Sequence, residues 1–573
     1  MRTLAGCSRL LILLVCFACV APASGAANPD FGPHVLVFNP SMPSSAIQEK
    51  IDKAFAVQKN AQFGPARYAL LFTPGEYTVN VPVGYYTQVV GLGATPDAVH
   101  ITGDVRSDAT LPNNNSTCTF WKSVEGLSVT PSGGTMQWAV SQATAFRRMH
   151  ILGNVVLHQK GGWASGGWMS DTLIDGNADA GPQQQWISRN TEWKSWTGQN
   201  WNMVFVGVPN PPPGEWPSPV YTKIAQVPII REKPFLEVDK AGRYSVKIPT
   251  LRSNSSGITW HGGSTPGKSI PIRDFYIARP DADSAESINA QLAKGMHVFF
   301  TPGIYDITDT IRVTKPNTVV MGLGYATLRP TNGVTAMTIA DVDGVIVAGL
   351  LFDAGAEKSP VLLEVGPTGS KARHARNPTS LHDVFFRVGG AGVGRAAVSL
   401  KVNSSDAIVD QTWIWRADHG SGVGWTTNTA ANGLIVNGND VTMYGLFVEH
   451  YQEYQVLWNG ERGRVYFYQS EIPYDPPDQP SYTSGPGVNG WASYKVADNV
   501  TTHEAWGLGI YSVFRQRNVS LSRAIEAPKK PGVKFHSMIT CRLGNNGEIK
   551  NIINDVGAAA VGNARPKLTS YPE

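Results

Sequence analysis

The sequence predicts an all-β protein made of two tandem parallel β-helices, each opened by a short helical cap. Three observations lead to this fold class. Short runs of β-branched and aromatic residues, such as Gly344–Phe352, Ala407–Trp415 and Thr442–Glu449, are separated by Gly, Asn and Asp. Few stretches have helical periodicity, and two blocks of sequence occur twice. A pair of antiparallel sandwiches is the alternative, and it is disfavoured because hairpin turns of the Asn-Gly type are few.

The internal repeat divides the chain into two related halves. Leu71–Tyr77 (LFTPGEY) is matched by Phe299–Tyr305 (FFTPGIY), and Val90–Gly93 (VGLG) by Met321–Gly324 (MGLG). Because the blocks recur in the same order, we expect one design to be used twice.

A helix-like segment precedes each repeated block, at Ser44–Gln58 and at Ser284–Leu292. In the first segment Ile47, Ile51 and Ala54 recur at the spacing of one helical face. We expect each helix to shield the first turn of its β-helix.

The N-terminus has the pattern of a secretory signal. Arg2 and Arg9 precede the apolar run Leu10–Val20, and small residues follow up to Ala26. The run is too short to span a bilayer, so we expect a secreted, soluble protein. The predicted division is a signal peptide (1–26), a first β-helix domain (27–209), a Pro-rich linker with a β excursion (210–275), a second β-helix domain (276–550) and a C-terminal tail (551–573).

Charge and cysteine content limit the classes of partner. The formal net charge is +4 and 16% of residues are charged, a balance that gives no reason to expect nucleic acid or a membrane surface as partner. Once the signal is removed, Cys118 and Cys541 remain, which could form one bridge but have no metal-binding spacing. We expect a monomer without metal or cofactor.

The strongest chemical signal is a pair of glutamates, Glu449 and Glu471, in the β-rich runs Leu446–Trp458 and Val465–Ile472. If these runs are neighbouring turns of a parallel stack, their backbones lie about 4.8 Å apart. One of two acids so close holds its proton to higher pH, as glycoside hydrolysis requires. The alternative is that both are solvated strand residues. His450 should point to the opposite face if the strand is regular.

The first half contributes polar and aromatic candidates. Gln183, Gln184 and Gln185 offer amides suited to sugar hydroxyls. Tryptophan is a good platform for the apolar face of a sugar ring, so we expect two or three of the tryptophans crowded between 163 and 201 in the site, Trp196 among them, and the others in the core. These six tryptophans are Trp163, Trp168, Trp186, Trp193, Trp196 and Trp201.

Several motifs resemble the exo-β-1,3-glucanases of glycoside hydrolase family 55. They are the pattern from Glu449 to Tyr474 (EH…YQ…QSEIPY), the segment from Gly181 to Asn190 (GPQQQWISRN) and Trp201–Phe205 (WNMVF). The resemblance covers about residues 35 to 550 and implies two right-handed β-helices packed side by side, with the site in the crevice between them. It also implies release of glucose from the non-reducing end of β-1,3-glucan, with inversion and without a metal.

Family roles carry over onto matching positions. Glu471 takes the place of the general acid, and Glu449 that of the carboxylate that helps hold the attacking water. One glutamine of Gln183–Gln185 should reach this water, and Trp415 and Tyr474 match aromatic residues that stack on sugar. One position departs from the family pattern: Val206 stands where a serine usually contacts the water.

Two rival functions stay open from the sequence. One is a β-helix hydrolase or lyase that acts on an acidic polysaccharide, which would need a basic crevice. The other is a catalytically silent carbohydrate-binding protein, which Val206 would favour. Asp418-His419-Gly420 matches part of a galacturonase pattern, but the paired aspartates of that family are missing, and we assign the segment no role.

Overall fold

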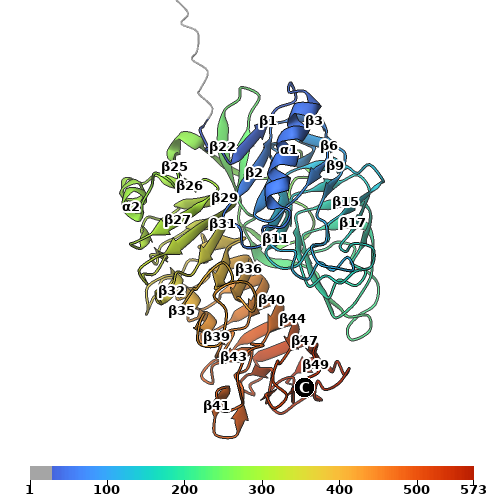
Figure 1. The fold of residues 1–573 in the computed structure, drawn as a ribbon, viewed down its shortest axis with the longest axis vertical. Coiled ribbons are helices and arrows are strands. Elements are labelled where there is room, and N and C mark those ends of the chain that lie inside the picture. Colours follow the sequence, from blue (N-terminus) through green and yellow to red (C-terminus); the bar gives the residue numbers. More distant parts are fainter. Residues whose placement is uncertain (1–28, 573) are drawn as a thin grey trace, which may run out of the picture.

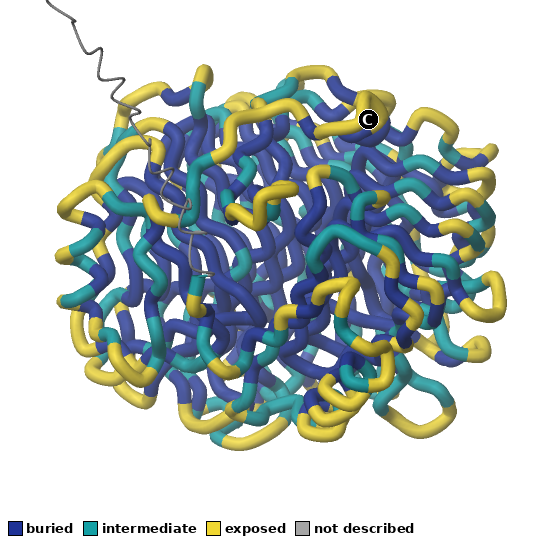
Figure 2. Tube along the Cα trace, turned by 90° about the horizontal axis from the view of Figure 1, so that it is seen from above, coloured by how far each residue is buried: buried dark blue, intermediate teal, exposed yellow. Residues whose placement is uncertain are grey.

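The computed structural model describes residues 29–572, so the predicted signal peptide lies outside the described residues. The described chain forms two parallel β-helices side by side (Figure 1). The first is coloured blue to green, and the second runs from yellow-green to red. Seen from above, the strands that fill the interior are buried and the exposed residues lie at the turns (Figure 2). The predicted all-β tandem architecture is confirmed.

In the first β-helix, neighbouring strands are parallel and come from successive turns of the chain. Its interface sheet, which faces the second β-helix, has the order β1 (Val35–Phe38), β2 (Tyr68–Phe72), β5 (Thr87–Gly91), β8 (Lys122–Glu125), β11 (Thr144–Arg147), β14 (Trp168–Ser170), β16 (Gln185–Arg189), β18 (Asn202–Val206) and β19 (Tyr221–Ile224). Its outer sheet contains β3 (Gly75–Thr78), β6 (Val99–Thr102), β9 (Ser128–Thr130), β10 (Thr135–Gln137), β12 (His150–Ile151), β13 (Asn154–Val156), β15 (Leu173–Asp179) and β17 (Glu192–Thr197).

The second β-helix repeats this arrangement. Its interface sheet contains β25 (Phe275–Ala278), β26 (His297–Phe300), β27 (Ile304–Ile307), β29 (Val319–Pro330), β31 (Ile346–Asp353), β33 (Ser380–His382), β34 (Phe385–Val388), β36 (Ile408–Arg416), β38 (Thr442–Glu449), β40 (Gly463–Glu471), β44 (His503–Ser512), β47 (Val533–Arg542) and β49 (Lys567–Tyr571). Its outer sheet contains β28 (Ile311–Val313), β30 (Met337–Ile339), β32 (Ser359–Val365), β35 (Ala396–Val402), β37 (Ala430–Val436), β39 (Val456–Trp458), β43 (Tyr494–Val496) and β46 (Ile525–Glu526). β49 pairs antiparallel with β47, so the C-terminal tail extends this sheet.

The repeated FTPGxY block has the same structural role in both halves. Tyr77 donates a hydrogen bond to the carbonyl of Thr73 at 2.7 Å and one to the carbonyl of Phe38 at 3.2 Å. Tyr305 makes the equivalent hydrogen bonds to Thr301 at 3.0 Å and Ala278 at 2.7 Å. In each half the tyrosine therefore ties the Pro-Gly turn to the preceding strand.

Both predicted caps are helices. α1 (Ser44–Gln58) buries Ile47, Ile51 and Ala54, the face that the sequence pattern indicates. α2 (Ala285–Lys294) begins with a capping box in which Ser284 accepts a hydrogen bond from the Ser287 amide. It ends at Gly295, whose φ of 91° suits glycine.

The linker between the two domains packs against both of them. The predicted β excursion is confirmed as β21 (Phe235–Val238) and β22 (Tyr244–Pro249), which form an antiparallel sheet with β24 (Gly267–Pro271). Val246 of this sheet packs in one apolar cluster with Leu71 of the first β-helix and Phe299 of the second. A further antiparallel pair consists of β20 (Val227–Ile230) and β23 (Arg252–Ser255).

The two interface sheets hold a buried apolar cluster that includes Trp168 and Ile187 of the first domain and Tyr444 and Phe447 of the second. Among residues 29–572, no helix is long and apolar enough to cross a membrane.

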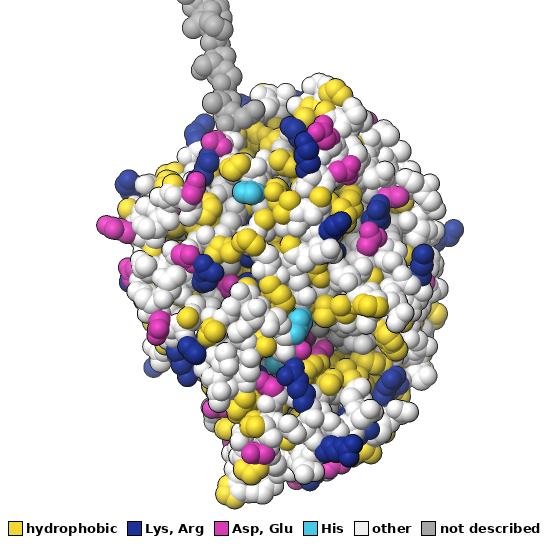
Figure 3. All heavy atoms as spheres, viewed as in Figure 1, with side chains coloured by type: hydrophobic (Ala, Val, Ile, Leu, Met, Phe, Trp, Pro, Cys, Tyr) yellow, Lys and Arg dark blue, Asp and Glu magenta, His cyan; other side chains and the backbone are white. Residues whose placement is uncertain are grey.

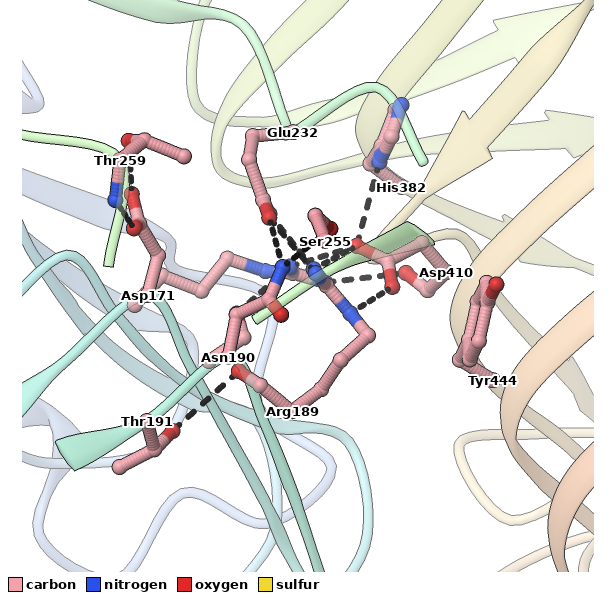
Figure 4. Close-up of polar contacts among 12 residues, drawn as sticks. Asp171, Arg189, Asn190, Thr191, Glu232, Ser255, Thr259, His382, Asp410 and Tyr444 are labelled. Carbon is pink, nitrogen blue, oxygen red and sulfur yellow. Dashed lines mark hydrogen bonds and ion pairs between the residues drawn. The ribbon is translucent and has the colours of Figure 1, made fainter. Parts of the chain in front are cut away.

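Charged side chains lie beside this apolar cluster and join the domains. Arg189, on β16, is fully buried and donates two hydrogen bonds to Asp410 on β36 and two to Glu232 of the linker (Figure 4). Arg147, on β11, pairs with Asp410 and with Asp383. Buried charges persist only when they are paired and hydrogen-bonded, so this network fixes how the domains dock.

Candidate active site

Glu449 and Glu471 end adjacent parallel strands, β38 and β40, and are direct partners in the strand register. Trp415 and Tyr511 occupy the same level on the strands at either side. The predicted placement of the two glutamates on neighbouring turns is confirmed.

A backbone irregularity directs these side chains toward the first domain. Four residues before Glu449, Gly445 has a φ of 63° and is skipped in the register with β40, where Phe467 has a φ of 73°. A left-handed residue at the same level of both strands turns the chain there and changes the direction of the side chains that follow. A Cβ at 445 would lie 2.5 Å from the ring of Trp168, so the close approach of the domains also requires glycine there.

The two glutamates open onto a pocket between the domains with a volume of about 260 Å³. This is near the lower end of the roughly 300–1,000 Å³ common for ligand pockets. The space-filling view shows a hollow with histidine and acidic side chains at its edge (Figure 3). The lining residues are Thr117, Cys118, Phe120, Gln142, Ser165, Gln184, Trp413, Trp415, Asp418, His419, Glu449, His450, Glu471, Tyr474 and Leu543.

Glu449 is held from both domains. Its Oε1 accepts a hydrogen bond from Gln142 Nε2 of the first domain at 2.8 Å, and its Oε2 accepts one from Trp413 Nε1 at 2.9 Å. Ser165 donates to the Gln142 side-chain oxygen at 3.3 Å. A polar chain therefore runs from Glu449 across the domain boundary to Ser165.

Glu471 lies beside aromatic and imidazole groups. Tyr474 donates a hydrogen bond to Glu471 Oε2, and His450 Nε2 lies 3.9 Å from the same oxygen. The His450 and Tyr474 rings are 4.4 Å apart and meet edge to face. Tyr474 thus contacts the acid as well as lining the pocket.

The pocket raises the pKa of both glutamates. Burial and the neighbouring Glu471 raise the pKa of Glu449 well above its usual range. Burial, opposed by the Tyr474 hydrogen bond, raises the pKa of Glu471 to about 7. Two groups this closely linked titrate as a pair, so near neutral pH they hold at least one proton between them.

Hydrogen bonding indicates which glutamate carries that proton. Both oxygens of Glu449 accept from N–H donors, an arrangement that suits the ionised carboxylate. Within residues 29–572, Oε1 of Glu471 accepts no such bond, and Glu471 is part of the pocket lining. This hydrogen bonding favours the proton on Glu471, although burial raises the pKa of Glu449 as well.

Asp418 and His419, for which no role was predicted, form a charged pair in the same pocket. His419 Nδ1 lies 2.8 Å from Asp418 Oδ1, and His450 Nε2 lies 3.8 Å from that oxygen. Burial alone would raise the pKa of Asp418. The neighbouring His419 and His450 outweigh burial, so the pKa of Asp418 lies below its usual value. Asp418 is consequently a fixed negative charge near Glu471.

Only one of the three candidate glutamines reaches the pocket. Gln184 lines it. Gln183 is fully buried and bonds the backbones of Gly166 and Leu157, and Gln185 is fully buried and bonds the Ser165 carbonyl. The glutamine that contacts Glu449 is Gln142, for which the local sequence carries no signal.

The structure places Trp415 and Tyr474 in the lining and Trp196 elsewhere. Trp196 packs against Trp193 and Phe205 in the core of the first β-helix, and its ring N–H donates to the Gly198 carbonyl. Its side chain points into the coil, so the expectation that Trp196 binds substrate is not met.

Two further expectations need correction. Val206 is fully buried in the apolar cluster between the domains and does not line the pocket, so its lack of a hydroxyl does not affect the lining. The serine that lines the pocket is Ser165, just before the tight Gly166-Gly167 pair. His450 lines the pocket instead of the opposite face, because its φ of 68° interrupts the strand alternation.

Cys118 and Cys541 are not bonded to each other. Cys118 lines the pocket, and Cys541 is fully buried on β47.

Comparisons with known proteins agree with this geometry. A family model described as LAM55 pectate lyase-like domain matches residues 275–471. An exo-β-1,3-glucanase from Streptomyces sp. (strain SirexAA-E / ActE) is 48% identical over 548 residues, covering 95% of this chain and 90% of that protein. The solved structure of sacteLam55A from Streptomyces sp. SirexAA-E has a TM-score of 0.93 at 47% identity, covering 95% of this chain and 99% of that one. A glutamate-to-alanine variant of sacteLam55A in complex with glucose matches equally well. At this identity over nearly its full length, the chain belongs to glycoside hydrolase family 55.

Proposed function

We propose that the protein is a secreted exo-β-1,3-glucanase that releases glucose from the non-reducing end of laminarin-type glucans with inversion. The observation that carries the proposal is the in-register pair Glu449 and Glu471, both directed into one pocket whose opposite side comes from the first domain. The activity of the Streptomyces relative points to the same reaction.

In this mechanism Glu471 is the general acid and donates its proton to the glycosidic oxygen as the bond to the anomeric carbon breaks. A pKa near 7 suits that role at mildly acidic and neutral pH. The attacking water lies on the side of Glu449, Gln142 and Ser165, where the carboxylate accepts its proton. The net change is one water consumed and one glycosidic bond cleaved.

A neutral substrate fits the lining better than an acidic one. The lining contains the carboxylates Asp418 and Glu449 and the protonated Glu471, against one cation, His419, and no lysine or arginine. An acidic polysaccharide would therefore meet repulsion, which argues against that rival function. Trp413 and Trp415, stacked at 4.6 Å, contribute apolar ring atoms to the lining, which suits the C–H groups of a neutral sugar.

The size of the pocket supports attack at a chain end. A volume of 260 Å³ fits a terminal sugar better than an internal run of a polysaccharide. We infer that the terminal glucose enters the pocket and the remaining chain stays outside.

Incubation with laminarin tests the proposal. The wild-type protein should release glucose, with the α-anomer appearing first in an NMR time course. Glu471→Gln should lower the rate by about 10²–10⁴-fold, the usual contribution of a general acid. Glu504→Gln, on β44 and paired with His536 at 2.9 Å, should retain wild-type activity as a control. Binding of laminarin without turnover by the wild type would support the silent-module alternative instead.

Export and monomeric state are parts of the same proposal. The pattern of residues 1–26 supports secretion. N-terminal sequencing of protein recovered from culture medium should start near Ala27. Light scattering should give the mass of one chain.

A further inference from the structure

A second pocket lies between the linker and the second β-helix. Its volume is about 430 Å³, compared with 260 Å³ for the pocket of the paired glutamates. Residues of the linker strands β22 and β24 line it together with the first residues of β29 and β31. A volume of this size is within the range that is common for ligand pockets.

The two pockets share no lining residue and lie at opposite edges of one sheet. Val319 and Ile346, which line the second pocket, begin β29 and β31 and are register partners. The same register level continues across the sheet to Thr442, the first residue of β38. Glu449 and Glu471 instead end β38 and β40. Because these strands are parallel, the second pocket is separated from the active site by the length of a strand.

Three basic side chains and no carboxylate line the second pocket. They are Arg231, Lys268 and Arg376, and we call it the basic pocket. None of the three forms an ion pair with a carboxylate of residues 29–572. Lys268 and Arg376 are exposed, whereas Arg231 is 8% exposed. Charges of one sign in a concave site attract a ligand of the opposite sign, so this pocket favours an anion.

Arg231 differs from the other buried arginines of residues 29–572. Four of these, Arg147, Arg189, Arg387 and Arg416, pair with carboxylates, and two, Arg67 and Arg148, lie over the rings of Tyr86 and Phe235. Arg231 has neither kind of neighbour within that range. Its Nη2 donates to the Asn377 side-chain oxygen at 2.8 Å, and its Nη1 lies 3.5 Å from the Pro378 carbonyl. Burial lowers the pKa of Arg231, with no carboxylate to offset the effect.

The rest of the lining suits a sugar that carries a carboxylate. A guanidinium has five N–H donors in a planar fork that matches a carboxylate, and the contacts above use two of them. Ile248 and Ile346, which belong to a buried apolar cluster, offer C–H contacts to a ring. Asn317 and Asn377, joined by a hydrogen bond of 2.8 Å, offer amide groups to hydroxyls.

We propose that the basic pocket binds a short stretch of an acidic polysaccharide, with the carboxylate of one uronic-acid unit on Arg231 and neighbouring carboxylates near Lys268 and Arg376. The inference goes beyond the proposed function and does not depend on it. The active-site lining repels anions, so hydrolysis of a neutral glucan and binding of an acidic one are assigned to opposite edges of the sheet. Such binding holds the enzyme on a matrix that contains both kinds of polysaccharide.

Calorimetric titration with trigalacturonate tests the proposal. The wild type should bind it without cleaving it, and maltotriose, a neutral trisaccharide, should not bind. Lys268→Gln should weaken binding about twofold to fivefold, the loss of one exposed ion pair. Arg231→Gln should weaken it by about tenfold or more, the loss of a charged hydrogen-bonding partner.

A matched control removes the same charge from the same linker sheet. Lys240, also exposed, lies in the turn between β21 and β22, at the other end of β22 from Ile248, the register partner of Lys268. Lys240→Gln should bind trigalacturonate as the wild type does. Lys268→Gln should release glucose from laminarin within twofold of the wild-type rate, because its side chain lies outside the active-site lining.

Four outcomes would overturn the basic pocket as a site for acidic glycan. They are no binding of trigalacturonate by the wild type, equal binding of maltotriose, equal weakening by Lys240→Gln and Lys268→Gln, and inorganic phosphate binding as tightly as trigalacturonate. The last would mean a simple anion site. If Arg231→Gln does not fold, Lys268→Gln and Arg376→Gln decide the question, since both side chains are exposed. Failure to hydrolyse laminarin would refute the proposed function and leave this test unaffected.

Discussion

Replacing Arg189 by methionine should weaken the docking of the two β-helices and lower the free energy of unfolding. Arg189 is fully buried, and its guanidinium lies between Glu232 and Asp410, with contacts of 2.6 Å to the first and 3.0 Å to the second. Methionine fills a similar volume but leaves both carboxylates without this partner. Asp410 keeps Arg147, whereas the hydrogen-bond partner left to Glu232 among residues 29–572 is the Asn190 amide, at 3.2 Å.

The expected cost follows from the burial of the pair. Removing one partner of a buried ion pair costs about 3–5 kcal/mol, because an uncompensated charge stays in the interior. Arg329→Met is the control: Arg329 also makes a two-point contact with one carboxylate, that of Asp306, but the side chains are 39% and 52% exposed. Its loss should cost at most about 1 kcal/mol.

The pH dependence gives a second test of the same reasoning. Burial raises the pKa of Glu232, but the charge and hydrogen bonds of Arg189 outweigh it, so the folded-state value is lowered. A lowered value contributes stability above the unfolded pKa, and this stability is lost as pH falls. Without Arg189, burial and the Asp410 charge should outweigh the remaining attraction of Arg147 and raise the pKa of Glu232. The difference in unfolding free energy between Arg189→Met and wild type should therefore be largest near neutral pH and shrink below about pH 5.

Denaturant unfolding followed by tryptophan fluorescence measures both effects. If unfolding is irreversible, the temperature of half-inactivation ranks the variants. An Arg189→Met protein within 1 kcal/mol of wild type at pH 7 would refute the claim that this network docks the domains.

Two further predictions concern the pocket, and a third concerns the apolar interface between the domains. Gln142→Ala should lower kcat on laminarin roughly 10–100-fold with KM little changed, because it removes a partner of Glu449 at the water side; unchanged kcat would exclude this role. Activity of the wild type should fall as pH rises through about 7, where Glu471 loses its proton, and Asp418→Asn should move this fall to lower pH, since the Asp418 charge raises the pKa of Glu471. A pH profile of kcat/KM measures both. Val206→Ser should leave kcat near wild type and lower stability by about 1–3 kcal/mol, because it places an unpaired hydroxyl in an apolar interface.

Local sequence patterns were sufficient to predict the architecture and the placement of Glu449 and Glu471 on neighbouring turns. The FTPGxY block recurs because its tyrosine makes the same two hydrogen bonds in each half. The spacing of Glu449 and Glu471 indicates neighbouring turns because parallel strands without insertion keep equivalent residues in register. Both features depend on contacts within one β-helix.

Contacts between the domains could not be predicted in this way. Gln142 and Glu449 are 307 residues apart, and their hydrogen bond exists only because two sheets dock in one register. Left-handed residues also change which face a side chain uses, which is why His450 lies in the pocket. The prediction for Trp196 was wrong for a simpler reason: tryptophan fills the interior of a coil as readily as it stacks on sugar.

The division of the pocket between two domains explains why its stability and its chemistry should be coupled. The acid and the aromatic wall come from β36, β38 and β40, whereas Gln142 and Ser165 come from the other β-helix. In the proposed mechanism one coil supplies the proton donor Glu471 and the carboxylate Glu449, and the other supplies Gln142 and Ser165 for the attacking water. Asp410, which anchors the docking network, lies on β36, the strand that also carries Trp413 and Trp415. A shift of one domain against the other would therefore lengthen the Gln142–Glu449 hydrogen bond before it unfolds either coil. Since misplacement of a catalytic group by about 1 Å can cost 10²-fold in rate, Arg189→Met should lose activity at denaturant concentrations where its secondary structure is still intact.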